Sequence, residues 1–134
     1  MLSILKKNSS FRGGIFLSTC NRTEFYTISE RSKIKHFDNF LLASTSNKFE
    51  IRKNDQYLFS GIDAFNHLLE VMTGIDSMIV GEPDIFGQVK KSFLNSKNFS
   101  FMTEDIESIF SGAIKLSKHV RTETKLSENP ISIA

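Results

Sequence analysis

The chain has 134 residues, of which 40% are hydrophobic and 24% are charged, and its formal net charge is +2. This length suits a single domain over residues 1–134, and the small net charge gives no electrostatic argument for binding nucleic acid. The single cysteine excludes an internal disulfide and a zinc site built from cysteines. The sequence has neither the apolar core of a signal peptide nor a run of roughly 20 apolar residues that could span a bilayer. We therefore expect a cytoplasmic protein that does not contact a membrane.

The N-terminal half of the chain predicts a small sheet. Residues 1–7 are amphiphilic and predict the end of a helix. An apolar run predicts a buried strand over 15–19, and residues 23–29, rich in Thr and aromatic side chains, predict a second strand antiparallel to it across a short turn. Residues 34–46 carry apolar side chains at a spacing that predicts a helix, and residues 57–59 predict a short strand.

The C-terminal half predicts three helices. In the first helix the apolar residues that recur at helical spacing are Phe65, Leu68, Leu69 and Met72, and Gly74 ends this helix. The second opens at Pro83, and its inner row is Ile85, Val89 and Phe93. Thr103 caps the third, whose buried stripe is Ile106, Ile109, Phe110, Ala113, Ser117 and Val120. A small sheet followed by helices predicts the α+β class.

Cys20, the only cysteine, lies where the first predicted strand ends, and polar residues such as Asn21 and Arg22 follow it. Rigid scaffolds often present reactive groups at such positions. A thiolate is the reactive form of cysteine, and nearby positive charge favours it, so Cys20 is a candidate nucleophile. A lone cysteine is also often a small buried hydrophobic residue, but a core cysteine seldom needs such polar neighbours.

Three blocks of the sequence resemble the glutamyl-tRNA reductase family, in its N-terminal catalytic domain. The first is Ser-Thr-Cys-Asn-Arg-Thr-Glu over residues 18–24, followed by an aromatic pair. The second runs from His67 through Gly-Ile-Asp-Ser-Met-Ile-Val-Gly-Glu-Pro at 74–83 to Gly-Gln-Val-Lys at 87–90. The third is Val-Arg-Thr-Glu-Thr at 120–124.

The resemblance implies a ferredoxin-like arrangement, strand–helix–strand–strand–helix–strand, with helices appended. Members of the family usually open with a strand bearing a Gly-x-x-His element, and none precedes the first predicted strand here. We therefore expect a domain that lacks its first strand, either as a fragment or as a shortened member. Residues from about 125 to 134 would lead towards a linker and an NADPH-binding domain that are absent, and the chain has no Gly-x-Gly-x-x-Gly.

The resemblance also implies a reaction. The Cys20 thiolate attacks glutamyl-tRNA to form a thioester, which NADPH reduces to glutamate 1-semialdehyde for tetrapyrrole (porphyrin) biosynthesis. This chain alone would be an incomplete oxidoreductase, because NADPH would bind elsewhere in the full-length enzyme. Other implied partners are a second copy, in a homodimer formed through a region absent here, and glutamate-1-semialdehyde aminomutase.

Site residues follow from the same resemblance. His67 points away from the apolar face of its predicted helix, near Asp63 and Glu70, so it is either a plain surface residue or the active-site histidine that the family carries ten residues before Ser77. Such a histidine can polarise a carbonyl or activate water. The expected catalytic residues are Cys20 and His67. The expected substrate-binding residues are Thr19, Arg22, Ser77, Glu82, Gln88 and Ser132.

Several alternatives remain open at this point. Arg22 can grip the glutamate carboxylate or form a salt bridge with Glu24. Lys115, Lys118 and His119 can meet tRNA phosphates or form a solvated helix face. The three histidines show no metal-ligand spacing, so we expect no metal site. The alternatives to a reductase domain are a tRNA-binding fragment without catalysis and a cysteine-dependent thioesterase or hydrolase.

Overall fold

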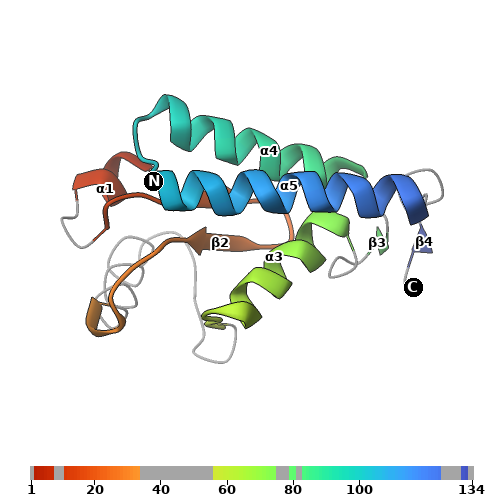
Figure 1. The fold of residues 1–134 in the computed structure, drawn as a ribbon, viewed down its shortest axis with the longest axis horizontal. Helices are drawn as coiled ribbons and strands as arrows, with labels where there is room; N and C mark the ends of the chain where they lie inside the picture. The colour runs from red at the N-terminus through yellow and green to blue at the C-terminus, as the bar shows by residue number, and fades with distance from the viewer. Residues whose placement is uncertain are drawn as a thin grey trace.

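The computed structural model describes residues 2–7, 11–33, 56–74, 79–80, 83–124 and 131–132, and these form an α+β structure, as predicted (Figure 1). The elements follow in chain order: α1 Leu2–Lys7, β1 Ile15–Ser18, β2 Thr23–Tyr26, the 3₁₀ helix η1 Arg31–Lys33, α3 Ile62–Thr73, β3 Ile79–Val80, α4 Pro83–Asn98, α5 Glu104–Thr124 and β4 Ile131–Ser132. The helix predicted over 34–46 lies outside the described residues. No helix within the described residues is long and apolar enough to cross a membrane.

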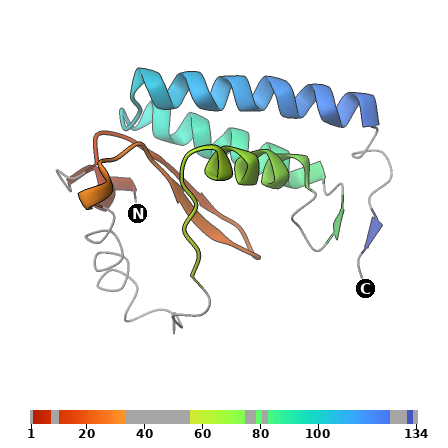
Figure 2. The same cartoon turned by 60° about the horizontal axis from the view of Figure 1, so that its bottom comes forward.

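The predicted hairpin is confirmed, with strands slightly shorter than expected. β1 and β2 pair antiparallel, with Ile15 opposite Tyr26 and Leu17 opposite Glu24. Residues directly opposite one another project from the same face of a sheet. That face therefore carries two buried apolar residues from β1 and a carboxylate and a phenol from β2. The helices lie over the hairpin (Figure 2), and on this face Glu24 is buried and Tyr26 is partly buried.

A second antiparallel pair, β3 with β4, lies near the C-terminal end of α5 (Figure 1). Within the described residues these two pairs are separate, so they do not form one continuous sheet of the ferredoxin-like kind. The strand predicted over 57–59 is wrong. These residues are not assigned to a strand, and all three side chains are exposed, so neither strand pairing nor burial of the apolar residues supports the prediction.

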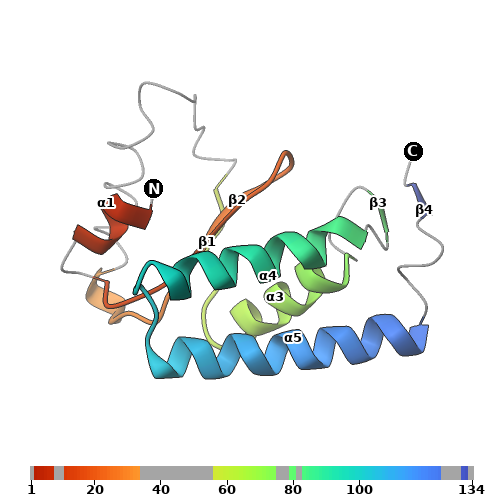
Figure 3. The same ribbon diagram turned by 90° about the horizontal axis from the view of Figure 1, so that it is seen from above.

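The three long helices form a helical layer in which α3 packs against both α4 and α5, and α4 packs against β1 (Figure 3). The main core joins this layer to the hairpin through Ile15, Leu17, Leu68, Val71, Met72, Ile85, Val89, Phe93, Ile106, Phe110 and Ala113. The inner row predicted for α4 is confirmed. The stripe predicted for α5 is confirmed at four positions, but Ile109 is 43% exposed and Val120 is only partly buried.

The predicted helix ends are also confirmed. Gly74 adopts the left-handed conformation with φ 79° and donates its N–H to the Val71 carbonyl at 3.1 Å, which ends α3. Pro83 is the first residue of α4. The Thr103 hydroxyl accepts the N–H of Ile106 at 3.3 Å and caps α5.

A smaller apolar cluster joins Leu5 of α1 to Phe11 and Phe101, with Phe25 of β2 packed against it. The Phe25 ring meets Phe11 edge-on at 5.4 Å between centroids and stacks on Phe101 at 6.4 Å. A Cβ added to Gly14 would lie 2.4 Å from the Phe25 ring. Only glycine therefore lets the chain pass this close to the ring at the start of β1.

Candidate active site

The loop between β1 and β2 presents the cysteine. The N–H of Thr19 donates to the Arg22 carbonyl at 2.8 Å. The Thr19 hydroxyl oxygen accepts the backbone N–H groups of both Asn21 and Arg22, each at 3.2 Å. A side-chain oxygen that binds two successive N–H groups fixes a tight turn. Cys20 therefore stands exposed on a loop whose shape Thr19 sets.

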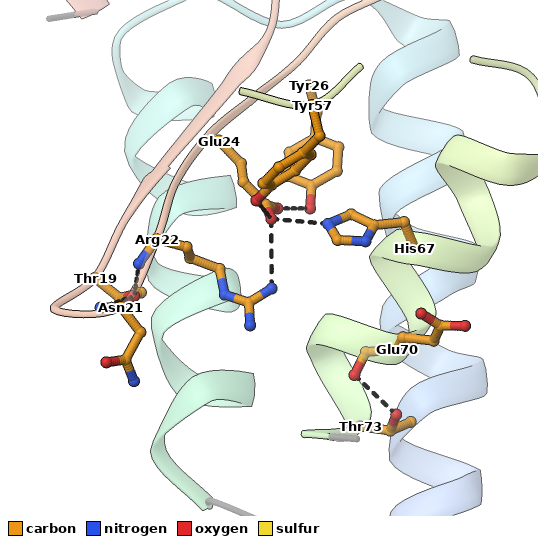
Figure 4. Close-up of polar contacts among 9 residues, drawn as sticks. All are labelled: Thr19, Asn21, Arg22, Glu24, Tyr26, Tyr57, His67, Glu70 and Thr73. Atoms are coloured by element: carbon orange, nitrogen blue, oxygen red, sulfur yellow. Dashed lines mark hydrogen bonds and ion pairs between the residues drawn. The ribbon is translucent and has the colours of Figure 1, made fainter. Parts of the chain in front are cut away.

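Glu24, on β2, is the centre of a polar network beside this loop (Figure 4). Its side chain is only 5% exposed. Its carboxylate accepts the Tyr57 hydroxyl at 2.5 Å, meets the Arg22 Nη1 at 3.4 Å and also accepts the Tyr26 hydroxyl. Glu24 Oε1, the oxygen that contacts Tyr57 and Arg22, also lies 2.8 Å from His67 Nε2. The hairpin, the segment before α3 and α3 itself thus meet at one carboxylate.

Burial and hydrogen bonding act in opposite directions on this carboxylate. Burial alone raises the pKa of Glu24, but hydrogen bonds from Tyr26, Tyr57 and His67 outweigh it and hold the pKa below its ordinary value. Burial, together with the adjacent Glu24 charge, raises the pKa of Tyr26 far above its usual range. At neutral pH the network therefore contains an ionised carboxylate and a neutral Tyr26 phenol.

His67 is more enclosed than its helical position suggests, with 11% of its side chain exposed. The Phe59 ring stacks on the imidazole at 4.7 Å, and the Tyr57 ring meets it at 5.5 Å. The expectation that it lies near Asp63 and Glu70 is confirmed, because these residues and His67 line one shallow pocket of about 290 Å³. A plain surface histidine would not be held in this way.

Arg22 makes the salt bridge that was one of its two expected contacts. Its side chain is 9% exposed and extends from the loop towards Glu24 (Figure 4). The guanidinium therefore lies between the cysteine loop and the His67–Glu24 pair. This contact leaves a role in binding substrate open, since guanidinium groups often bind more than one carboxylate oxygen.

The other predicted substrate-binding residues are only partly placed. Gln88 on α4 donates to the Asp84 carboxylate at 2.6 Å. It lines a groove of about 900 Å³ together with Ser18, two residues before the cysteine. Ser77 and Glu82 lie outside the described residues, and Ser132 is described only as part of β4.

Two further expectations concern charged groups. Lys115, Lys118 and His119 are exposed on α5, as the helical pattern predicts. Within the described ranges, no cluster of three or more His, Cys, Asp or Glu residues could hold a metal ion.

Arg121 is the charged residue whose role the sequence left unassigned, and it is 7% exposed. Its Nη1 donates to the Met72 carbonyl at 3.3 Å, and its guanidinium lies 5.4 Å from the centre of the Phe86 ring. Burial lowers the pKa of Arg121. Arg121, on α5, thus contacts both α3 and α4.

Most of the polar network was not predicted from the sequence. Glu24 was expected only as a possible partner of Arg22, and Tyr26 and Tyr57 had no expected role. Tyr57 and His67 both contact Glu24 but lie 33 and 43 residues from it in the sequence. A signal for Glu24 existed, since the strand register puts it on the same face as buried Leu17.

A family model described as "Glutamyl-tRNAGlu reductase, N-terminal domain" matches residues 1–124. The chain belongs to the glutamyl-tRNA reductase N-terminal domain family. Among solved structures, glutamyl-tRNA reductase from Methanopyrus kandleri is similar, with a TM-score of 0.76 and 27% sequence identity. The match covers 91% of this chain and 28% of that one, so the chain spans less than a third of the Methanopyrus enzyme.

Proposed function

We propose that this chain is the catalytic domain of a glutamyl-tRNA reductase and that Cys20 is its nucleophile. The cysteine sulfur attacks the ester carbonyl of glutamyl-tRNA, and a C–S bond forms. The bond between that carbonyl and the tRNA ribose oxygen breaks, the ribose oxygen takes up a proton, and glutamate remains as a thioester. The observation that carries this proposal is the exposed Cys20 on the loop of Arg22, whose guanidinium contacts Glu24, the partner of His67, in a chain of this family.

The remaining roles belong to the same proposal. Arg22 binds a carboxylate of the substrate, with Thr19, Ser77, Glu82, Gln88 and Ser132 around the glutamyl group. His67 moves a proton during acyl transfer. The ferredoxin-like arrangement, the cytoplasmic location, the homodimer, the aminomutase partner and the tetrapyrrole role are proposed for the full-length enzyme.

Reduction of the thioester to glutamate 1-semialdehyde needs a hydride, which no side chain supplies and NADPH does. A dinucleotide pyrophosphate is usually held by a glycine-rich turn at a helix N-terminus. The chain contains no Gly-x-Gly-x-x-Gly, and the N-terminal turns of the described helices do not supply such a turn. The described residues therefore do not fit this cofactor, and the reduction is proposed for the full-length enzyme alone.

A second candidate function is a cysteine-dependent thioesterase or hydrolase. One observation favours it: His67 has an acidic partner, Glu24, at 2.8 Å. A cysteine, a histidine and an acidic residue form the set of groups that many hydrolases use. In that case water releases the glutamate that the cysteine has taken.

The test is to mix this chain with glutamyl-tRNA, quench with acid and measure the mass of the protein. We expect either a glutamyl adduct on Cys20 or free glutamate, and adding NADPH should change neither. Cys20→Ser is the control and should abolish both. If Cys20→Ser formed as much adduct or free glutamate as the wild type, the result would contradict the cysteine mechanism. Binding of tRNA with neither product would favour the fragment without catalysis.

A further inference from the structure

We propose that Glu24 is a positioning residue that holds His67 in a single tautomer, with the proton on Nε2 and with Nδ1 as the proton acceptor. The catalytic part of this inference rests on the proposed function, whereas the tautomer itself does not. Neither the motif nor the helical pattern of the sequence points to this role. The contact between two residues 43 positions apart is what carries it.

The geometry leaves the imidazole little freedom. His67 Nε2 lies 2.8 Å from Glu24 Oε1, a normal hydrogen-bond length. Phe59 stacks on the ring with an interplanar angle of 28°, and Tyr57 contacts it at 61°. A 180° flip of the ring would put Cε1 in the place of Nε2, break the bond to Glu24 and leave its buried oxygen with one donor fewer. The stacked rings and the carboxylate therefore favour one orientation.

The chemistry of the carboxylate then selects the tautomer. An ionised carboxylate only accepts hydrogen bonds, so the nitrogen facing it must carry a proton. The Tyr26 and Tyr57 hydroxyls, which also donate to Glu24, favour this ionised form. A neutral imidazole carries one N–H, so a proton on Nε2 leaves the lone pair on Nδ1.

This arrangement suits the proposed acyl transfer. In that step we assign to Nδ1, directly or through a water molecule, the proton that the Cys20 thiol loses as the C–S bond forms. It returns the proton to the ribose oxygen as the C–O bond breaks. Between these events the ring is an imidazolium, whose positive charge lies beside the Glu24 carboxylate. A carboxylate that orients a histidine and stabilises its charged form is a common arrangement in acyl-transfer sites.

The tautomer is measured directly from the ring ¹⁵N shifts of histidine-labelled protein at alkaline pH, where the ring is neutral. The chain has three histidines, so His36→Gln and His119→Gln identify the His67 signals. We expect wild-type His67 to carry its proton on Nε2. A proton on Nδ1, or an even mixture of tautomers, would overturn the proposal whatever the variants do.

Variants separate this role from general packing. Glu24→Gln, of similar size, should raise the proportion of the Nδ1–H tautomer, while Glu24→Asp should restore part of the preference if it folds. Glu70→Gln is the matched control, because Glu70 lines the same shallow pocket as His67 but is exposed. An equal change in Glu70→Gln would contradict a specific role for Glu24.

Activity gives an independent readout. At saturating glutamyl-tRNA, Glu24→Gln should slow formation of the Cys20 adduct by about 10²-fold, the lower end of what a positioned proton-transfer group contributes. In a His67→Gln background the same change should cost less than about threefold, since both act through one proton transfer. Fully additive losses would contradict the proposal. If wild type yields neither adduct nor free glutamate, the proposed function fails, and the ¹⁵N shifts still decide the tautomer.

Discussion

Arg121 donates a hydrogen bond from its guanidinium to the backbone carbonyl of Met72 at 3.3 Å, which ties the last turn of α5 to the last turn of α3. Carbonyl groups in the last turn of a helix have no partner within the helix, and positive charge is favourable there. The sequence gives Arg121 no assigned task, but the structure makes it a link between helices.

Replacing Arg121 should therefore destabilise the fold. Arg121→Met keeps much of the length of the side chain but loses its donors, so we expect a loss of about 1–3 kcal/mol, typical of a buried acceptor left without its partner. Urea unfolding followed by circular dichroism measures this change. Lys118→Met, at an exposed position of the same helix, should change the stability by less than about 0.5 kcal/mol. Equal losses in the two variants would show that the Met72 contact contributes nothing.

Cys20 should be the site of alkylation in the folded protein. The thiol is exposed, and no second cysteine competes for the reagent. Iodoacetamide should add one adduct per chain under native conditions, as measured by intact mass. Cys20→Ser should remain unmodified. Modification that requires a denaturant would mean that the loop hides the sulfur, and the assignment of Cys20 as nucleophile would fail.

The hydrogen bonds to Glu24 predict a loss of stability in acid. The pKa of Glu24 is lowered on folding from an ordinary value of 4.5, so the folded state binds fewer protons than the unfolded state between the two pKa values. This contribution is fully present above about pH 4.5 and is lost as the pH falls through the folded pKa. Urea unfolding at several pH values between about 3 and 7 measures it.

Glu24→Gln should remove this part of the acid dependence, so its stability curve should be flatter below the ordinary pKa. Glu123→Gln, at an exposed position on α5, should keep the wild-type curve. Identical curves for wild type and Glu24→Gln would mean that the carboxylate gains nothing from its tyrosine and histidine partners.

Arg22→Lys tests the proposed carboxylate contact. A lysine retains the charge but cannot reproduce the planar pair of donors of a guanidinium. Hydrogen bonds to charged groups contribute about 1.5–3 kcal/mol, so kcat/KM for adduct formation should fall by about 10- to 100-fold. Arg12→Lys, at an exposed position, is the control. Unchanged kcat/KM in Arg22→Lys would rule out Arg22 as the group that binds the glutamate carboxylate.

Local sequence signals predicted the elements that depend on local physics. The spacing of Leu68 and Met72 predicted α3, and Gly74 and Pro83 marked helix ends that the structure confirms. The short turn at Cys20 followed from an apolar run that stops at polar residues. Each of these features is determined by neighbours within a few residues, so a single sequence reveals them.

Long-range features were harder to predict. Residues 57–59 are β-prone, but the sequence does not show that Tyr57 instead reaches Glu24. The enclosure of His67 likewise depends on the Phe59 ring and on the Glu24 carboxylate, which comes from β2. The resemblance implied roles for His67 and Arg22 but none for Glu24, which connects them. Such contacts depend on how elements pack, which periodicity does not encode.

The contact between Arg22 and Glu24 has a consequence for the thermodynamics of binding. A free arginine on a surface loses rotamer entropy and part of its hydration when it meets a ligand. Here the side chain is already 91% covered and held by a carboxylate 3.4 Å away. The losses of rotamer entropy and hydration therefore occur when the protein folds. A ligand carboxylate that contacts Arg22 then meets a preorganised group. Binding at this position should therefore carry a smaller entropic penalty than binding to an arginine that is ordered only by its ligand.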